Sequence, residues 1–196
     1  MQTKVKKVIW ITIFSVTGYF SFYYLLIGPA VLPLGFQEAR VAGANLAEQI
    51  TSLSNKSLKN LNDISKHDAN QNYDEALALV ARALIDNKEA NNRAIELSTQ
   101  LALMAQKIAD IRPAKGREIA SEAITYEVAL VSRLINYNAT LHELFDVLRG
   151  KFLGNLPSSD DRVEKLLNEV NESTRVINGL NKAFGDALER FDIIYK

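Results

Sequence analysis

The side chains that could do chemistry are few, and their spacing fits no common catalytic motif. The chain has 0 cysteines and 2 histidines, which excludes disulfides, thiolate metal sites and a cysteine nucleophile. A di-iron bundle needs two Glu-x-x-His motifs, but Ile64 precedes His67 at that spacing and Ala139 precedes His142. The serine-hydrolase, phosphate-loop and zincin motifs are also missing from the sequence. We therefore predict no catalytic, metal-binding or cofactor-binding residue, and a hydrolase is the weakest of the interpretations considered.

A second group of candidates consists of polar side chains on the apolar faces of predicted helices. Counting positions from each predicted turn brings six of them to two nearby levels of a candidate polar core layer: Asn91, Asn138 and Ser173 at one level, and Ser98, Glu127 and Asn181 about two turns closer to the membrane. A buried polar atom without a partner costs about 1–3 kcal/mol, so these groups should bond to each other or to water. We favour a role in fixing helix register, as in coiled coils, over a small-ligand pocket.

Glu127 is the most informative member of this layer. A carboxylate in a helix–helix seam needs a charged partner or a raised pKa. The simpler alternative is that Glu127 sits at the edge of the seam in contact with water.

Four long amphipathic helices are expected to position these side chains. We predict them at about residues 37–66, 73–111, 114–149 and 160–195. Apolar residues recur at heptad spacing in each, most clearly in the row Val163, Val170, Ile177, Phe184 and Phe191. Such rows indicate coiled-coil-like seams between helices. Short turns then give an all-α fold, an elongated antiparallel up-down four-helix bundle about 45–55 Å long.

The bundle follows a segment that is typical of a membrane anchor. Residues 8–27 carry no charge and, as a helix, reach about 30 Å, the thickness of one hydrocarbon core. The connector at residues 28–36 contains helix-breaking prolines and is expected at the membrane interface. A cleaved signal peptide is the alternative because Gly28-Pro29-Ala30 offers small residues, although the apolar run is long for one.

Basic residues give this signal anchor a direction. Lys4, Lys6 and Lys7 precede the apolar run, and no basic residue follows it before Arg40. The positive-inside bias therefore predicts that residues 1–7 are a cytoplasmic tail and that residues 37–196 are extracytoplasmic.

The anchor also assigns the two ends of the predicted bundle. The turn that returns to the membrane surface carries three cations that could meet anionic headgroups, namely Arg112, Lys115 and Arg117. The loop at the distal tip carries three apolar residues, Phe152, Leu153 and Leu156. We expect these apolar side chains to cover the open bundle end, and a docking patch for another protein is the alternative.

Charge and motifs together favour a non-enzymatic role. The 23 basic residues equal the 23 acidic residues, and the lysines before the anchor leave the exported part mildly acidic. No basic stripe is visible, which argues against a nucleic-acid partner. We expect an interaction or scaffolding module of the cell envelope whose partners are membrane lipid, through residues 8–27, and another envelope protein or a second copy. The alternative is an extracytoplasmic ligand-sensing bundle that signals through a partner protein, because residues 1–7 are too short for a cytoplasmic signalling domain.

Overall fold

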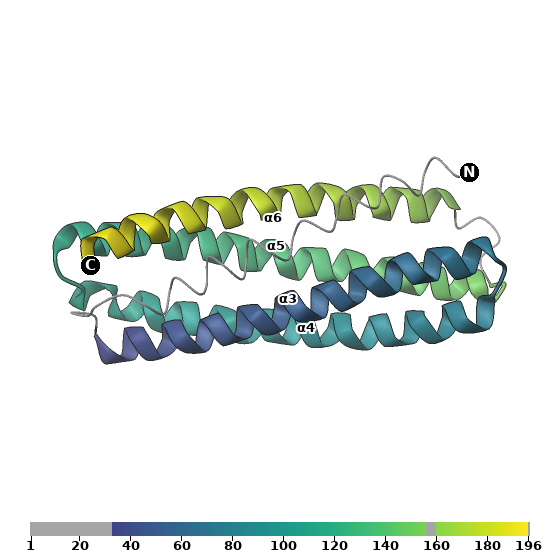
Figure 1. Ribbon diagram of the computed structural model, residues 1–196, viewed down its shortest axis with the longest axis horizontal. Coiled ribbons are helices and arrows are strands. Elements are labelled where there is room, and N and C mark those ends of the chain that lie inside the picture. Colours follow the sequence, from purple (N-terminus) through teal and green to yellow (C-terminus); the bar gives the residue numbers. More distant parts are fainter. Residues whose placement is uncertain (1–32, 156–159, 196) are drawn as a thin grey trace.

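The computed structural model describes residues 33–155 and 160–195, and this part of the chain is a bundle of four long helices (Figure 1). Their bounds are α3 Leu34–Ala69, α4 Tyr73–Lys107, α5 Ala114–Phe152 and α6 Asp160–Tyr195. A short 3-10 helix, η2 Ile108–Asp110, follows α4. The all-α class and the four-helix bundle are confirmed. The predicted anchor at residues 8–27, the connector up to residue 32 and Leu156 lie outside the described residues.

Within the described ranges, no helix combines the length and the apolar character needed to cross a membrane. α3 begins inside the predicted connector, directly after Pro33, and its first turn is closed by the bond from the Phe36 backbone N–H to the Pro33 carbonyl at 2.9 Å. Proline suits this position because a helix needs no hydrogen-bond donor there.

Successive helices run in opposite directions along the long axis (Figure 1). α3 packs along α4, α4 along α5, and α5 along α6, whereas the backbones of the neighbouring helices α3 and α6 make few close approaches. α3 and α6 meet instead through long side chains. The rings of Phe36 and Phe191 lie 6.5 Å apart, and Arg40 reaches Asp192 at 3.4 Å.

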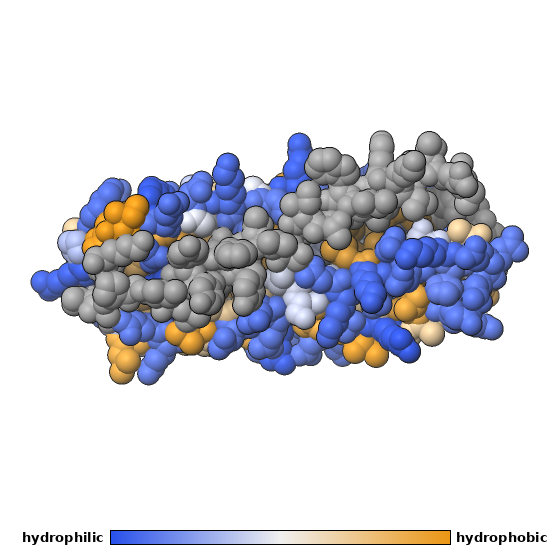
Figure 2. Space-filling view, viewed as in Figure 1, coloured by the Kyte–Doolittle hydropathy of each residue, from blue (hydrophilic) through white to orange (hydrophobic). Residues whose placement is uncertain are grey.

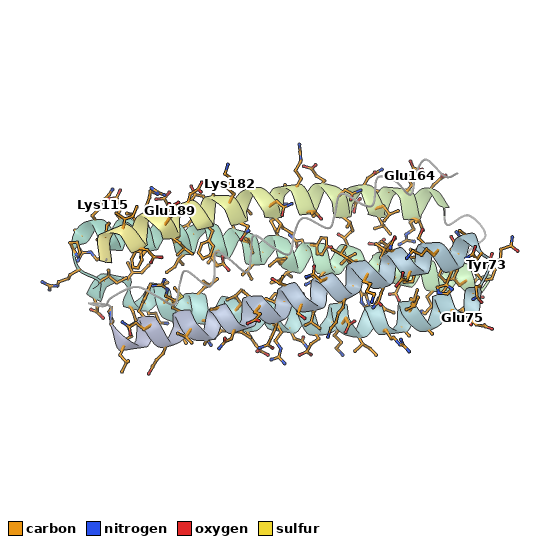
Figure 3. All side chains as sticks on the ribbon, viewed as in Figure 1. Tyr73, Glu75, Lys115, Glu164, Lys182 and Glu189 are labelled. Atoms are coloured by element: carbon orange, nitrogen blue, oxygen red, sulfur yellow. The ribbon has the colours of Figure 1, made fainter. Side chains whose placement is uncertain are left out.

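The bundle has two distinct ends. We call proximal the end formed by the start of α3, the η2 turn and the last turn of α6. The distal end holds the α3–α4 turn and the end of α5. Figure 3 places Lys115 and Glu189 at the proximal end, and Tyr73 and Glu75 at the distal end.

The heptad rows form the core, as the sequence predicts. On α6, Val170, Ile177, Phe184 and Phe191 are buried, and Val163 is partly buried against the same core. On α4 the corresponding row is built largely of alanine, with Ala76, Ala83 and Ala90 at most 1% exposed. These small side chains let neighbouring helix backbones approach closely.

Four helix ends differ from the sequence prediction by three or four residues: α3 begins at Leu34 and ends at Ala69, α4 ends earlier and α5 ends later than predicted. α5 continues to Phe152 and is then stopped by Gly154, whose φ of 72° lies in the left-handed region that glycine tolerates. α4 ends at Lys107, and η2 carries the chain into the turn before α5. Figure 2 shows that the described residues on the visible face are mostly hydrophilic, with apolar side chains scattered among them.

Candidate functional site

The predicted polar layer is divided between buried and accessible positions. Glu127 is 1% exposed and Asn138 is 2% exposed. Three members, Asn91, Ser173 and Asn181, are half-buried. Ser98 is exposed, and its hydroxyl donates to the Ile95 carbonyl at 2.6 Å. Each of the two predicted levels therefore has one buried member, Asn138 at one and Glu127 at the other, and Ser98 lies outside the core.

A cluster of neutral polar side chains occupies the distal half of the core. Asn87 of α4, 3% exposed, donates through Nδ2 to the backbone carbonyl of Asn138 on α5 at 2.7 Å. On the neighbouring seam Tyr137 of α5 lies near Thr174 of α6, whose hydroxyl donates to the Val170 carbonyl at 2.8 Å. Burial raises the pKa of the Tyr137 hydroxyl above its usual value. We name Asn87, Asn138, Tyr137 and Thr174 the distal polar cluster.

Some buried polar atoms near this level have no hydrogen-bond partner among the described residues. They are Asn87 Oδ1, Asn138 Nδ2 and the hydroxyls of Ser54 and Ser57 on α3. Because such groups are normally satisfied by ordered water when protein partners are missing, water is expected at these atoms. Neutral amides and hydroxyls bridging helices fit a role in fixing helix register.

A second cluster, made of ionisable groups, lies in the proximal half. Arg40 of α3 is 5% exposed, and its Nη2 donates to Asp192 Oδ1 of α6 at 3.4 Å. The guanidinium carbon also lies 5.8 Å from the centre of the Phe191 ring, within reach of a cation–π interaction. Burial lowers the pKa of Arg40, and the charge and hydrogen bond of Asp192 oppose that shift.

Glu127 of α5 belongs to this proximal half, but no described side chain compensates its charge. Its Oε2 has no hydrogen-bond partner among the described residues. Burial raises the pKa of the Glu127 carboxyl from 4.5 to about 8, with no opposing contribution from a cation. The carboxyl is therefore mostly protonated at neutral pH, which is how a buried acid avoids the cost of an unpaired charge.

Glu127 and Arg40 both line a cavity of about 30 Å³ that all four helices enclose. This space is enough for about two water molecules. Its apolar walls include three aromatic side chains, Phe36, Phe184 and Phe191, and three small residues, Gly43, Ala120 and Ala123. We name this space the Glu127 cavity.

The donor set around this cavity is small. In residues 33–155 and 160–195, no group of three or more histidine, cysteine or acidic side chains is placed to hold a metal ion. Glu127 and Arg40 border the Glu127 cavity, but the surface that faces the space is apolar.

The two predicted surface sites are also placed. At the distal end Phe152 is 8% exposed and stacks on Tyr73, with ring centres 5.7 Å apart, whereas Leu153 is 55% exposed. At the proximal end Arg112 and Lys115 are exposed and Arg117 is half-buried. Lys115 pairs with Glu118 at 2.9 Å, so this turn presents an acidic charge beside its cations.

Sequence reasoning missed several buried polar groups. Asn87 stands in the same heptad row as Val80 and Ala94, so its position in the seam was available as a signal. Arg40 and Asp192 gave none, because charged residues are usually exposed and their contact joins residues 152 positions apart.

Comparisons of the chain with protein-family models, with curated proteins and with solved structures found no match. The class that the described residues define is an antiparallel four-helix bundle with a carboxyl-bearing apolar cavity.

Proposed function

We propose that the chain is a membrane-tethered, extracytoplasmic helical bundle that acts as a non-enzymatic interaction or scaffolding module of the cell envelope. The observation that carries the proposal is that α3, which follows the apolar run at residues 8–27, begins at the same end of the bundle as the Arg112–Arg117 turn. A bundle tethered there would hold Arg112, Lys115 and Arg117 near lipid headgroups. Its distal end, with the exposed Leu153, would point away from the membrane.

The topology is tested with single-cysteine variants, since the natural chain has 0 cysteines. Thr3→Cys reports on the N-terminal tail, and Glu75→Cys reports on an exposed position at the distal end. In intact cells a membrane-impermeant maleimide should label Glu75→Cys, and it should label Thr3→Cys only after permeabilisation. The reverse pattern, or release of the protein by alkaline washing of membranes, would overturn the tethered topology.

The interaction role is tested by crosslinking in native membranes followed by mass spectrometry. A photoreactive residue in place of Leu153, which is 55% exposed, samples the distal end, and one in place of Lys182 samples the outer face of α6 as a second surface. The proposal expects a recurrent envelope protein, or a second copy, at one of these positions. A monomer with no crosslinked product at either position contradicts the scaffolding role.

A ligand-sensing bundle is the second candidate, and the Glu127 cavity is the specific observation that favours it. A sensor needs an internal site whose occupancy changes helix packing, and this cavity touches all four helices. Because the cavity lies next to the contact between α3 and α6, ligand binding could change a seam where the backbones make few close approaches. Signal transfer would then require a partner protein in the membrane.

A further inference from the structure

The outer side of α4 carries a stripe of exposed positions that is nearly free of charge. The stripe runs from Ala78 to Ala102 in alternating steps of three and four residues, and every position in it is exposed. Its large apolar members are Ile85 and Ile95, which are 69% and 50% exposed, and its one charged member is Lys88. Apolar residues at this spacing form the seam between paired helices. We name these positions the α4 outer stripe.

The outer side of α6 shows that exposed helix positions in this bundle are not generally uncharged. Exposed positions there at similar spacing include six charged residues, namely Glu164, Glu172, Arg175, Lys182, Asp186 and Glu189. α4 packs on α3 and α5 through its other side, where Ala76, Val80 and Ala83 are 0% exposed. α4 therefore has two seams at heptad spacing, one filled by the bundle core and one without a partner among the described residues.

The α4 outer stripe is complementary to itself when two copies run in opposite directions. α4 spans Tyr73–Lys107, and Ala90 is its midpoint. In an antiparallel pair centred at the height of Ala90, residues equally far above and below the midpoint lie opposite each other, and two-fold symmetry makes each contact occur twice. The contacts are Ala78 with Ala102, Ala81 with Thr99, Ile85 with Ile95, and Lys88 with Asn92. The large apolar side chains thus meet each other, and small side chains further out let the helices approach closely.

The charges beside the stripe favour this antiparallel pair over a parallel one. Arg82 and Glu96 flank the stripe on the same side, and both are exposed. In the antiparallel pair Arg82 of one copy lies within about one turn of Glu96 of the other, which allows two ion pairs per dimer. Lys88 then faces the side-chain amide of Asn92. A parallel pair would set Lys88 against Lys88 of the second copy, and these like charges repel.

We propose that the chain forms an antiparallel dimer through the α4 outer stripe. The proposal rests on the interaction role proposed above and names a second copy of this chain as the partner. The paired stripes extend over about 35–40 Å, nearly the full length of α4. The starts of the two α3 helices lie at opposite ends of this dimer, so two copies tethered as proposed above would join facing membranes.

Disulfide mapping of the full-length chain in detergent micelles tests the register, since the natural chain has 0 cysteines. Ala81→Cys and Thr99→Cys are small changes at exposed positions, and a tag on one of the two proteins distinguishes the products by size. Mild oxidation of the mixture should give the mixed disulfide between the two variants. Each variant alone should crosslink at least about tenfold less, because its two thiols lie about 27 Å apart along the dimer, beyond the reach of a disulfide. Lys182→Cys on α6 is the control that should not crosslink.

Sedimentation equilibrium of the same preparation measures the association itself. Ile85→Glu places a carboxylate in the apolar contact with Ile95, so it should raise the dissociation constant of the dimer at least about tenfold. Ile193→Glu is the matched control, because Ile193 is 66% exposed on α6, outside the stripe. This control should leave the dissociation constant unchanged.

Three results would overturn the proposal. They are a natural protein that stays monomeric at every concentration measured, equal weakening by Ile85→Glu and Ile193→Glu, and disulfides within each single variant without the mixed product, as a parallel pair would give. The substituted positions are exposed in the single chain, so the variants should keep the fold, which circular dichroism checks. These outcomes leave the cysteine-labelling test of tethering and the search for an envelope partner at Leu153 unaffected.

Discussion

The proximal and distal halves of the bundle core treat buried polar groups differently. In the distal half, Asn87 donates to the Asn138 carbonyl and Thr174 donates to the Val170 carbonyl, and both side chains are without formal charge. In the proximal half, Arg40 is paired with Asp192, and Glu127 faces a cavity. The four helices thus bury neutral polar side chains in the distal half of the core and charged or acidic side chains in the proximal half.

This difference matters because burying a neutral polar group and burying a charged group cost unequal amounts of free energy. A neutral buried amide or hydroxyl without its partner costs about 1–3 kcal/mol and stays neutral at every ordinary pH. A buried carboxyl avoids a larger penalty only by keeping its proton. The distal polar cluster is therefore suited to fixing helix register, whereas the proximal half is suited to responding to changes in pH.

The largest expected effect is a pH dependence that arises from Glu127 alone. Its folded-state pKa of about 8 lies above the ordinary 4.5, so between these values the folded protein retains a proton that the unfolded chain has lost. The free energy of unfolding should then fall by about 1.4 kcal/mol per pH unit as pH rises from about 5 to about 8, and flatten above that. Urea unfolding of the full-length chain in micelles measures this slope.

Glu127→Gln is the matched control for the pH dependence. It should remove the slope, so that the stability difference between the two proteins changes by about 4 kcal/mol across that pH range. Parallel pH profiles for the natural protein and Glu127→Gln would show that Glu127 is hydrated in solution, and the contrast between the two core halves would disappear.

The next largest effect is expected from breaking the proximal ion pair. Asp192→Leu removes the carboxylate that Arg40 contacts in a site where Arg40 is 5% exposed. Leaving a buried charge without its partner should cost about 3 kcal/mol of unfolding free energy. The double variant Arg40→Met with Asp192→Leu should recover most of this loss. A double variant as unstable as Asp192→Leu alone would mean that the unpaired charge is not the cause.

A smaller effect is expected in the distal polar cluster. Asn87→Ala removes the 2.7 Å bond to the Asn138 carbonyl and should cost about 1 kcal/mol, with no dependence on pH between about 5 and 8. Asn91→Ala, one turn further along α4 and half-buried, should change stability by less than about 0.5 kcal/mol. Equal losses in the two variants would show that the distal bond contributes nothing specific.

The smallest effect concerns the cavity wall. Alanine exceeds glycine in helix propensity by about 1 kcal/mol, and Gly179→Ala should gain this because nothing lies within 4 Å of its Cβ position. At Gly43 a Cβ would meet Leu97 Cδ1 at 3.3 Å, so Gly43→Ala should gain only about half as much, as Leu97 shifts towards the cavity. If thermal unfolding shows equal gains in stability for Gly43→Ala and Gly179→Ala, the cavity wall at Gly43 is loosely packed.

Most of the fold can be predicted from the sequence because apolar residues at heptad spacing are the ones that the helix packing buries. Rows such as Val170, Ile177 and Phe184 are buried as their spacing requires. The end of α4 shifts because η2 continues it in a different helical form, and the end of α5 shifts because Gly154 stops that helix. The exact ends of these helices depend on local turn geometry, which the heptad spacing does not indicate.

From the sequence, the burial of a polar residue can be predicted only where its position in an apolar heptad row places it in the helix seam. Glu127 and Asn138 stand in apolar rows, and both are buried. Matching heights between helices is accurate to about one turn, which is the separation between Asn91 and the buried Asn87. The burial of Arg40 depends on a partner at the far end of the chain, on α6, and no local pattern indicates it.

The most direct measurement of the central claim is the titration of Glu127 itself. Carbon-13 NMR of the chain with labelled glutamate carboxyls, assigned with Glu127→Gln, follows one resonance through its proton loss. The account predicts a midpoint near pH 8 for Glu127, well above those of the exposed glutamates. A midpoint near 4.5 would contradict it, because a carboxyl in water, or one with a charged partner, would then occupy this position.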